Sequence, residues 1–403
     1  MKNLLALVLA ALASWTSFAE TRILFSARTS DVAAFDLYVM SSTGTGLRRL
    51  ADTATVSEWG AALSPDNFHV AYVDRNALTG NLYVGDLLGG APARINIAGR
   101  VLAVDWIDAN SLCYLLRNGT YDGDFTIRRV NADGTGDAAV YADIFHNYST
   151  GGDTLTVHRP TGRVYFSSFF GSVTIRSGLL GGATPDRAYA RGVDALAGGE
   201  FGVEGTTLYD HYDPCPSPDG TRIAFAADHG TGYHRIYTKN NDPAETDSVS
   251  RRGDVYCGDP AWSPDGTWIA FTRAAISTFG EGPYIGNIIR NSATGVAAET
   301  NLTSALAAIA GRCGQPAVYE APACPSALEI LSTTRIPAGT LLAWPATPGL
   351  VYQVSYSDDA MQTWNETLPA SRLLAAAGET SLTYTDTTAA PAQRIYKLVV
   401  TCP

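Results

Sequence analysis

The sequence predicts an all-β protein in which a β-propeller built from repeated hairpins is followed by a small β-sandwich. A tight hairpin motif, clearest as D-P-A-W-S-P-D-G-T-W-I-A-F at 259–271, recurs along most of the chain. The last ~80 residues instead alternate apolar and polar positions with the period of two that marks half-buried strands. The composition agrees, because 46% hydrophobic residues, 39 glycines, 20 prolines and only 17% charged residues are typical of a turn-rich β protein with ample core.

The hairpin motif is a type I turn between two strands. In the turn at 263–266, Pro264 presets φ at the second position, Asp265 caps locally and Gly266 suits the last position. The apolar run W-I-A-F that follows predicts a strand buried on both faces. One hairpin cannot bury such faces alone, so the neighbours must come from other copies.

The chain contains further copies of the hairpin motif, with decreasing similarity to the segment 259–271. Turn-and-strand segments related to the first lie at 217–225, 64–72, 159–166 and 105–115. Each continues into a third strand, for example at 235–237. A four-stranded unit of ~40 to 50 residues repeated around an axis is the signature of a propeller.

These residues resemble the TolB-type β-propeller family, whose repeats carry the W-S-P-D-G-x-x-I-A-F pattern followed by an I-Y strand. The resemblance covers 21–319 and is most specific around Pro218 and Pro264. It implies a six-bladed propeller over 20–319, with a first blade that lacks its own inner strand. The segment 313–318 matches 257–262 in pattern, so we expect it to return to the first blade and close the ring.

The N-terminus has the features of a secretory signal peptide over residues 1–19. Lys2 precedes an apolar run that is too short for a membrane span, and Ser17-Phe18-Ala19 gives a small-x-small cleavage pattern. We therefore expect an exported protein, periplasmic or extracellular, without membrane insertion.

The composition changes after the propeller. The segment 320–325, E-A-P-A-C-P, is predicted to be a linker, and 326–403 a separate domain. Residues 340–344 are predicted to form a strand that places Trp344 in the core of that domain, followed by an alternating strand at 352–357 and a closing strand at 394–400. These features resemble a fibronectin type III module, which implies a spacer or an attachment domain.

Six cysteines in an exported protein favour disulfide bonds. Cys257 and Cys313 hold equivalent positions in neighbouring repeats, so a bridge between them would lock the ring closure. Cys324 and Cys402 bracket the C-terminal domain and could staple it. The alternative, in which these cysteines stay reduced or pair in another way, is left open.

Charge and motifs exclude several classes of function. The net charge of −11, with no basic run, disfavours nucleic acid and anionic membranes as partners. The chain contains no Gly-x-Ser-x-Gly elbow and no phosphate-binding glycine loop, so no motif supports a serine hydrolase or a nucleotide-binding protein. It also contains no His-Glu-x-x-His or Cys-x-x-Cys motif, so no motif indicates a metal site. No cofactor is expected, although the alternative of a divalent metal ion bound at the channel mouth is left open.

Aligning the repeats gives a candidate binding site. Asp213, Asp259 and Gln315 fall at one equivalent position in three neighbouring repeats, and Glu58 and His211 lie one or two residues earlier in theirs. We expect these side chains to form a mostly acidic ring at the channel mouth, on the face where the inner strands begin, because a hollow with convergent polar groups is the usual binding place. In the alternative interpretation, the aspartates only hydrogen-bond loop amides.

The sequence therefore favours a non-catalytic binding protein that engages an envelope or extracellular protein or peptide at this mouth. The first alternative is a secreted polysaccharide lyase-like propeller enzyme, for which His211, Tyr209, Tyr212 and Arg252 would be at hand for proton abstraction from a carbohydrate. The second is a passive scaffold attached through the C-terminal domain. No residue is assigned a catalytic role.

Overall fold

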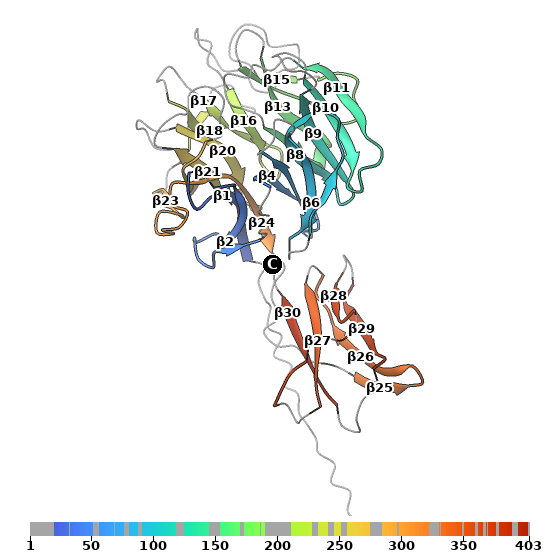
Figure 1. The fold of residues 1–403 in the computed structure, drawn as a ribbon. Helices are drawn as coiled ribbons and strands as arrows, with labels where there is room; N and C mark the ends of the chain where they lie inside the picture. Colours follow the sequence, from blue (N-terminus) through green and yellow to red (C-terminus); the bar gives the residue numbers. More distant parts are fainter. Residues whose placement is uncertain are drawn as a thin grey trace, which may run out of the picture. The chain divides into compact units, whose positions relative to one another are not determined.

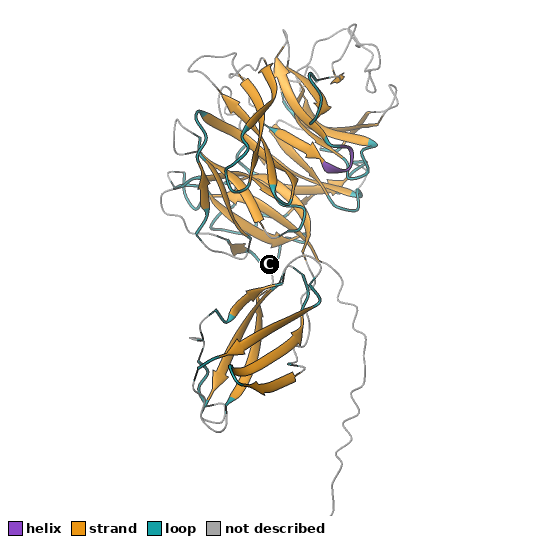
Figure 2. Cartoon of the chain, turned by 90° about the vertical axis from the view of Figure 1, so that its right-hand side faces the viewer, coloured by secondary structure: helices purple, strands orange, loops and turns teal. Residues whose placement is uncertain are grey.

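The prediction of an all-β chain is confirmed. The computed structural model describes residues 20–31, 33–50, 56–67, 69–75, 80–87, 91–117, 125–144, 154–169, 173–185, 187–189, 211–227, 233–240, 246–250, 256–274, 284–295, 298–321, 330, 332–348, 350–358, 362–365, 368, 370–375, 379–388 and 394–401. These residues are almost entirely β-strands, and the helical part of them is one short 3-10 turn, η2 (Arg159–Thr161), as Figure 2 shows. The predicted signal peptide lies outside the described residues.

The described residues fall into two compact units, and the first spans Thr21–Ala321. Its described strands form six four-stranded sheets, in each of which strands consecutive in the chain pair antiparallel. In sheet order the strands are β24 (Cys313–Ala321), β1 (Glu20–Ala27), β2 (Asp36–Ser41), β3 (Arg48–Arg49); β4 (Glu58–Leu63), β5 (His69–Asp74), β6 (Leu82–Asp86), β7 (Ala93–Ile95); β8 (Arg100–Asp108), β9 (Ser111–Arg117), β10 (Phe125–Asn131), β11 (Ala138–Ile144); β12 (Leu155–His158), β13 (Arg163–Phe169), β14 (Val173–Leu179), β15 (Arg187–Tyr189); β16 (His211–Pro216), β17 (Arg222–Ala227), β18 (Arg235–Asn240), β19 (Thr246–Ser248); and β20 (Tyr256–Trp262), β21 (Trp268–Ala274), β22 (Asn287–Ser292), β23 (Thr300–Asn301).

The six sheets form a closed ring. The strand at one edge of each sheet contacts the corresponding strand of the next, in the cycle β4, β8, β12, β16, β20, β24 and back to β4. We call these six strands the inner strands. Each inner strand lies at the edge of its sheet and contacts the inner strands on either side, so its unpaired edge faces the middle of the ring.

The ring is closed by its last strand, as the sequence predicted. β24 pairs with β1, so the two ends of the unit lie in one sheet, and Figure 1 shows the orange strand beside the blue one. β24 also runs two residues past the expected domain end at Tyr319. Ala321 is buried in the apolar cluster of this sheet, and the carbonyl of Glu320 accepts a hydrogen bond from Asn67 Nδ2 at 2.9 Å. The expected linker therefore begins with two strand residues, and the rest of 320–325 lies outside the described residues.

The repeated turn has one geometry in three sheets. The serine Oγ donates to the aspartate two residues later at 2.6, 2.6 and 2.5 Å, in the pairs Ser64–Asp66, Ser217–Asp219 and Ser263–Asp265. The fourth turn residue is left-handed, with φ of 59°, 70° and 69° at Asn67, Gly220 and Gly266. Glycine and asparagine adopt this conformation most readily, which explains why only these two residues follow S-P-D in the chain.

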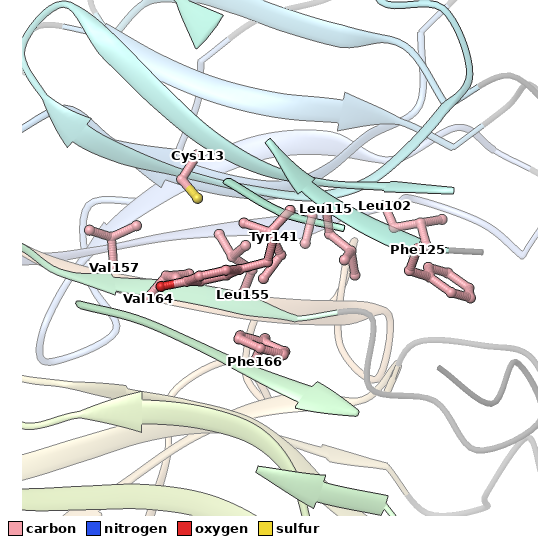
Figure 3. Close-up of a cluster of buried hydrophobic side chains, with 11 residues drawn as sticks. Leu102, Cys113, Leu115, Phe125, Tyr141, Leu155, Val157, Val164 and Phe166 are labelled. Carbon is pink, nitrogen blue, oxygen red and sulfur yellow. The ribbon is translucent and has the colours of Figure 1, made fainter. Parts of the chain in front are cut away.

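Apolar side chains from neighbouring sheets fill the space between them. Figure 3 shows one such cluster, in which Cys113 and Leu115 of one sheet face Val157, Val164 and Phe166 of the next. Burying each such aliphatic or aromatic side chain contributes about 1.5–3 kcal/mol. The ring is thus held together mainly by sheet-to-sheet packing.

Tryptophans on the inner strands add hydrogen bonds to this packing. Trp106 and Trp262 are 0% and 6% exposed. Their indole nitrogens donate to the inner strand of the preceding sheet, to the carbonyls of Ala62 at 3.0 Å and Cys215 at 2.9 Å. Each indole therefore satisfies its polar atom while it seals a joint between sheets.

The predicted bridge between Cys257 and Cys313 is absent, and both residues are free, buried thiols. Cys257 packs between its own sheet and that of β16, whereas Cys313 packs between its own sheet and that of β20. Because the positions are equivalent, both thiols point the same way around the ring, and the sheet that begins with β20 separates them. Cys324 and Cys402 lie outside the described residues.

The second unit contains the described residues of 330–401. Its described strands form two three-stranded sheets: β25 (Ser332–Ile336), β26 (Gly339–Pro345) and β29 (Ser381–Asp386); and β28 (Arg372–Leu374), β27 (Val351–Ser357) and β30 (Ile395–Thr401). Trp344 is 0% exposed and packs with Tyr352 and Leu382, as expected of a core tryptophan.

Candidate functional site

The six inner strands enclose a cavity of about 630 Å³. Its lining includes residues of every inner strand and of the turns that follow several of them. Five lining residues are exposed, and we call them the rim: Pro65, Arg159, Pro160, Pro218 and Glu320. The cavity therefore meets solvent at the end where the inner strands finish.

A left-handed residue interrupts four consecutive inner strands. Gly60, Asp213, Asp259 and Gln315 have φ of 64°, 53°, 53° and 48°. The register shifts at this point in β4, β16 and β20, so that two residues face one on the neighbouring strand, which defines a β-bulge. A left-handed conformation costs about 1–2 kcal/mol for a residue other than glycine. Compensation must come from the contacts that the three side chains make.

The structure brings Asp213, Asp259 and Gln315 together in the wall of the cavity. We call them the acceptor cluster. Asp213 Oδ1 accepts from Thr154 Oγ1 at 3.1 Å, and Asp213 Oδ2 accepts from the backbone N–H of Asp259 at 3.1 Å. The first bond comes from the residue just before β12 and the second from β20, so Asp213 links β16 to both neighbouring segments of the ring.

Asp259 repeats this pattern one sheet further. Its Oδ2 accepts from Thr272 Oγ1 at 3.1 Å, and the backbone N–H of Gln315 in β24 donates to the same hydroxyl at 3.1 Å and also stabilises the carboxylate. The alternative expectation, that the aspartates bind amides, describes these contacts, although the amides belong to inner strands rather than loops.

The two carboxylates resist ionising together. Asp259 is 9% exposed, and burial followed by the charge of Asp213 raises the pKa of Asp259 well above its usual value. The Thr272 hydroxyl, the Gln315 amide and the more weakly acting Arg75 oppose this rise. Two like charges in a buried site favour the protonated form of one carboxyl group.

Gln315 completes the acceptor cluster with a buried oxygen. Its Oε1 accepts no hydrogen bond within the described part of the chain. A β-carbon added at Gly60 would lie 2.9 Å from this oxygen. Gly60 is thus required for its left-handed φ and for the room it leaves to the Gln315 side chain.

A charged bridge near the rim was not foreseen from the sequence. Arg159 donates to the carbonyls of Leu63 at 2.9 Å and Trp106 at 3.2 Å, and pairs with Asp105 at 3.3 Å. Asp105 Oδ2 also accepts from the Val157 amide at 2.7 Å. The residues are far apart in the chain, and the only sequence signal was that Arg159 stands where the other turns have serine.

The remaining predicted site residues lie elsewhere or are not described. Glu58 is 0% exposed, and its Oε2 accepts from the Leu37 amide at 2.9 Å in the neighbouring sheet instead of lining the cavity. His211 begins β16, but its side chain lies outside the described residues, as do Tyr209 and Arg252. Loops before several inner strands are also outside them, so a mouth at that end stays a prediction.

A histidine–tyrosine pair lies beside the acceptor cluster. His234 Nδ1 is hydrogen-bonded to the Tyr284 hydroxyl, and the His234 ring stacks on Tyr212 at 4.7 Å. Burial, and then the charges of Asp213 and Asp259, raise the pKa of Tyr284 well above its usual value. Such a pair could in principle relay a proton.

Metal ligands do not converge in the described residues. No group of three or more histidine, cysteine, aspartate or glutamate side chains is placed there to hold an ion. The described chain also contains no helix that could span a bilayer.

Comparison with known proteins identifies the fold but not a family. No protein-family model and no curated protein matches the sequence. Among solved structures, TolB from Acinetobacter baumannii is similar with a TM-score of 0.52 and 16% identity, over 74% of this chain and 66% of that chain. A chain from the nidogen/laminin complex is similar with a TM-score of 0.50 and 13% identity, over 74% of this chain and 98% of that one. These identities support a shared arrangement of sheets only.

Proposed function

We propose that this chain is an exported, non-catalytic binding protein that captures a protein or peptide partner in the cavity of a six-bladed β-propeller. The observation that carries the proposal is the cavity of about 630 Å³, which lies within the size range of ligand sites and is lined by polar groups converging from separate strands. In this proposal residues 1–19 direct export to the periplasm or the outside, and the second unit is a fibronectin type III-like sandwich that serves as a spacer.

The fold supports binding more than catalysis. Thr154, Thr272 and backbone amides already hold the carboxylates of Asp213 and Asp259, so these groups shape a surface and are poorly placed as nucleophiles. One similar structure is of a complex between two proteins, nidogen and laminin. TolB, the other similar protein, also shares the arrangement of sheets.

Site-specific photocrosslinking tests the proposal. A photoreactive amino acid replaces Glu320 at the rim in one version of the full chain and Glu379, an exposed residue of the second unit, in another. Both are incubated with an extract of the native envelope and irradiated. We expect a defined crosslinked partner from position 320 only. Crosslinking from position 379 alone would place the binding site on the second unit.

The carbohydrate-active alternative is favoured by one observation, the bond between His234 and Tyr284. A lyase would use such a pair to remove a proton from a uronate and protonate the leaving group. Incubation with uronic polysaccharides should then release unsaturated products that absorb ultraviolet light, and His234→Ala should abolish this release. An inactive wild-type protein would eliminate the alternative.

A further inference from the structure

The three residues of the acceptor cluster line the cavity. Asp213 and Asp259 are 3% and 9% exposed, and their carboxylates already accept hydrogen bonds within the chain. The buried Oε1 of Gln315 accepts no hydrogen bond among the described residues. A group that satisfies all three must donate several hydrogen bonds.

The backbone directly after each residue of the acceptor cluster lacks a hydrogen-bond donor. Each residue of the acceptor cluster is followed by a proline that also lines the cavity: Pro214, Pro260 and Pro316. Proline has no N–H, so the free edges of β16, β20 and β24 offer no amide there. The local chemistry thus disfavours a carboxylate or phosphate ligand, which would need donors.

Between the acceptor cluster and the rim, several of the residues that line the cavity are apolar. Ala261 and Val318 are among them. A ligand that enters from the rim therefore passes apolar surface before it reaches the acceptors. Lysine and arginine side chains have this composition, with an aliphatic stem and a head that donates three or five hydrogen bonds.

We propose that the cavity recognises a ligand through an organic cation, the ammonium or guanidinium group of a lysine or arginine side chain, bound by Asp213, Asp259 and Gln315. This inference rests on the proposed function, because it takes the cavity as the binding site and names the group that enters it. Binding brings the second carboxylate of the pair into its ionised form, so the cation enters as a proton leaves.

Small probes test the proposal on the full chain from residue 20. N-acetyl-arginine amide and N-acetyl-lysine amide present a side-chain cation, N-acetyl-citrulline amide is the neutral counterpart of the arginine probe, and alanine amide carries only an α-amine. Calorimetric titrations in two buffers of different ionisation enthalpy give the affinity and the number of protons released. We expect the arginine or lysine probe to bind at least tenfold more tightly than citrulline, with release of a proton on binding.

Two substitutions of Gln315 test the site without changing Asp213 or Asp259, which also connect neighbouring sheets. Gln315→Glu adds an acceptor charge and should tighten the binding of the cationic probe several-fold, whereas Gln315→Lys places a cation in the cluster and should abolish it. Asp265→Asn, a change in an exposed turn outside the cavity lining, is the matched control and should leave affinity unchanged. Thermal unfolding confirms that each variant is folded.

Several results would overturn the inference. Equal binding of citrulline, equal affinities of the two Gln315 variants, or tight binding of Ca²⁺ or Mg²⁺ without binding of the organic cations would each do so, and binding of alanine amide alone would point to a polypeptide N-terminus. If the probes fail while crosslinking from position 320 still captures a partner, this inference is wrong and the proposed function stands. If the probes bind but no partner is captured, the proposed function fails instead.

Discussion

The carboxylate of Asp213 accepts a hydrogen bond from the backbone N–H of Asp259 at 3.1 Å, and each of these residues is left-handed at the same bulge of adjacent inner strands. The contact joins β16 to β20 at the wall of the cavity. The residues that would bind a ligand are thus the residues that connect neighbouring sheets. Ligand binding and the stability of the ring are expected to be linked through them.

Gly60→Ala tests how strictly the bulge position is constrained. The substitution puts a β-carbon 2.9 Å from Gln315 Oε1 at a φ of 64°, so it should cost the left-handed penalty of about 1–2 kcal/mol plus the cost of moving the Gln315 side chain. Urea denaturation measures the loss.

Gly46→Ala is the matched control, because Gly46 has a φ of 67° and no atom within 4 Å of the added β-carbon. It should show the conformational penalty alone. In a Gln315→Ala background, Gly60→Ala should cost no more than Gly46→Ala. An undiminished cost there would show that the clash with Gln315 is not the cause.

The features that the sequence predicted well are those that the repeat imposes locally. The S-P-D-G turn needs a serine hydroxyl and a left-handed fourth residue, and both can be recognised in any copy. Asp213, Asp259 and Gln315 could be aligned with one another because a left-handed residue followed by proline keeps one position in the repeat. The return of 313–318 to the first sheet was predictable for the same reason.

The features that the sequence did not predict depend on the direction of a side chain or on contacts between residues far apart in the chain. Glu58 lies two residues before the bulge, where its side chain turns toward the Leu37 amide, and no repeat pattern specifies that orientation. Cys257 and Cys313 are equivalent, and equivalence makes their thiols parallel instead of opposed. The Arg159–Asp105 bridge joins residues that only the closed ring brings together.

Truncation tests the closing strand. Removing 322–403 leaves all six sheets of the first unit intact, so its thermal unfolding should stay within a few degrees of the full chain. Removing 313–403 also deletes β24, which exposes the edge of β1 and one face of the apolar cluster around Ile23 and Phe25. We expect this shorter chain to unfold at much lower temperature or to aggregate. Identical melting of the two truncated chains would contradict closure by β24.

Asn67→Gly tests the side-chain bond that holds the end of the closing strand. Glycine keeps the left-handed φ of 59° but removes the donor to the Glu320 carbonyl. The expected loss of stability is about 0.5–1.5 kcal/mol, as for a single hydrogen bond. Asn67→Ala should lose more, because it adds the left-handed penalty. A glycine variant as stable as the wild type would show that the bond contributes nothing.

The raised pKa of Asp259 predicts how the stability of the ring depends on pH. Burial and the charge of Asp213 keep a proton on this carboxyl in the folded state at pH values where the unfolded chain, with a value near 3.8, has released it. The folded state then binds more protons than the unfolded state, so stability is lost as pH rises from about 4 toward the raised pKa. Asp259→Asn removes the titrating group, and the stability of the wild type relative to this variant should fall over that range by up to about 1.4 kcal/mol per pH unit.

Asp265→Asn is the control, because the contribution of Asp265 to stability should change with pH in the opposite direction. The hydroxyl of Ser263 lowers the pKa of Asp265, despite some opposition from burial, so this carboxylate stabilises the fold above the unfolded value of 3.8 and the contribution is lost on acidification. Urea denaturation of the three proteins between pH 3 and 8 should therefore give two difference curves with opposite slopes. Because Asp213 titrates with Asp259, the first curve reports the pair. A flat curve for Asp259→Asn would mean that folding does not raise the pKa of Asp259, and the protonated carboxyl at the cavity wall would have to be abandoned.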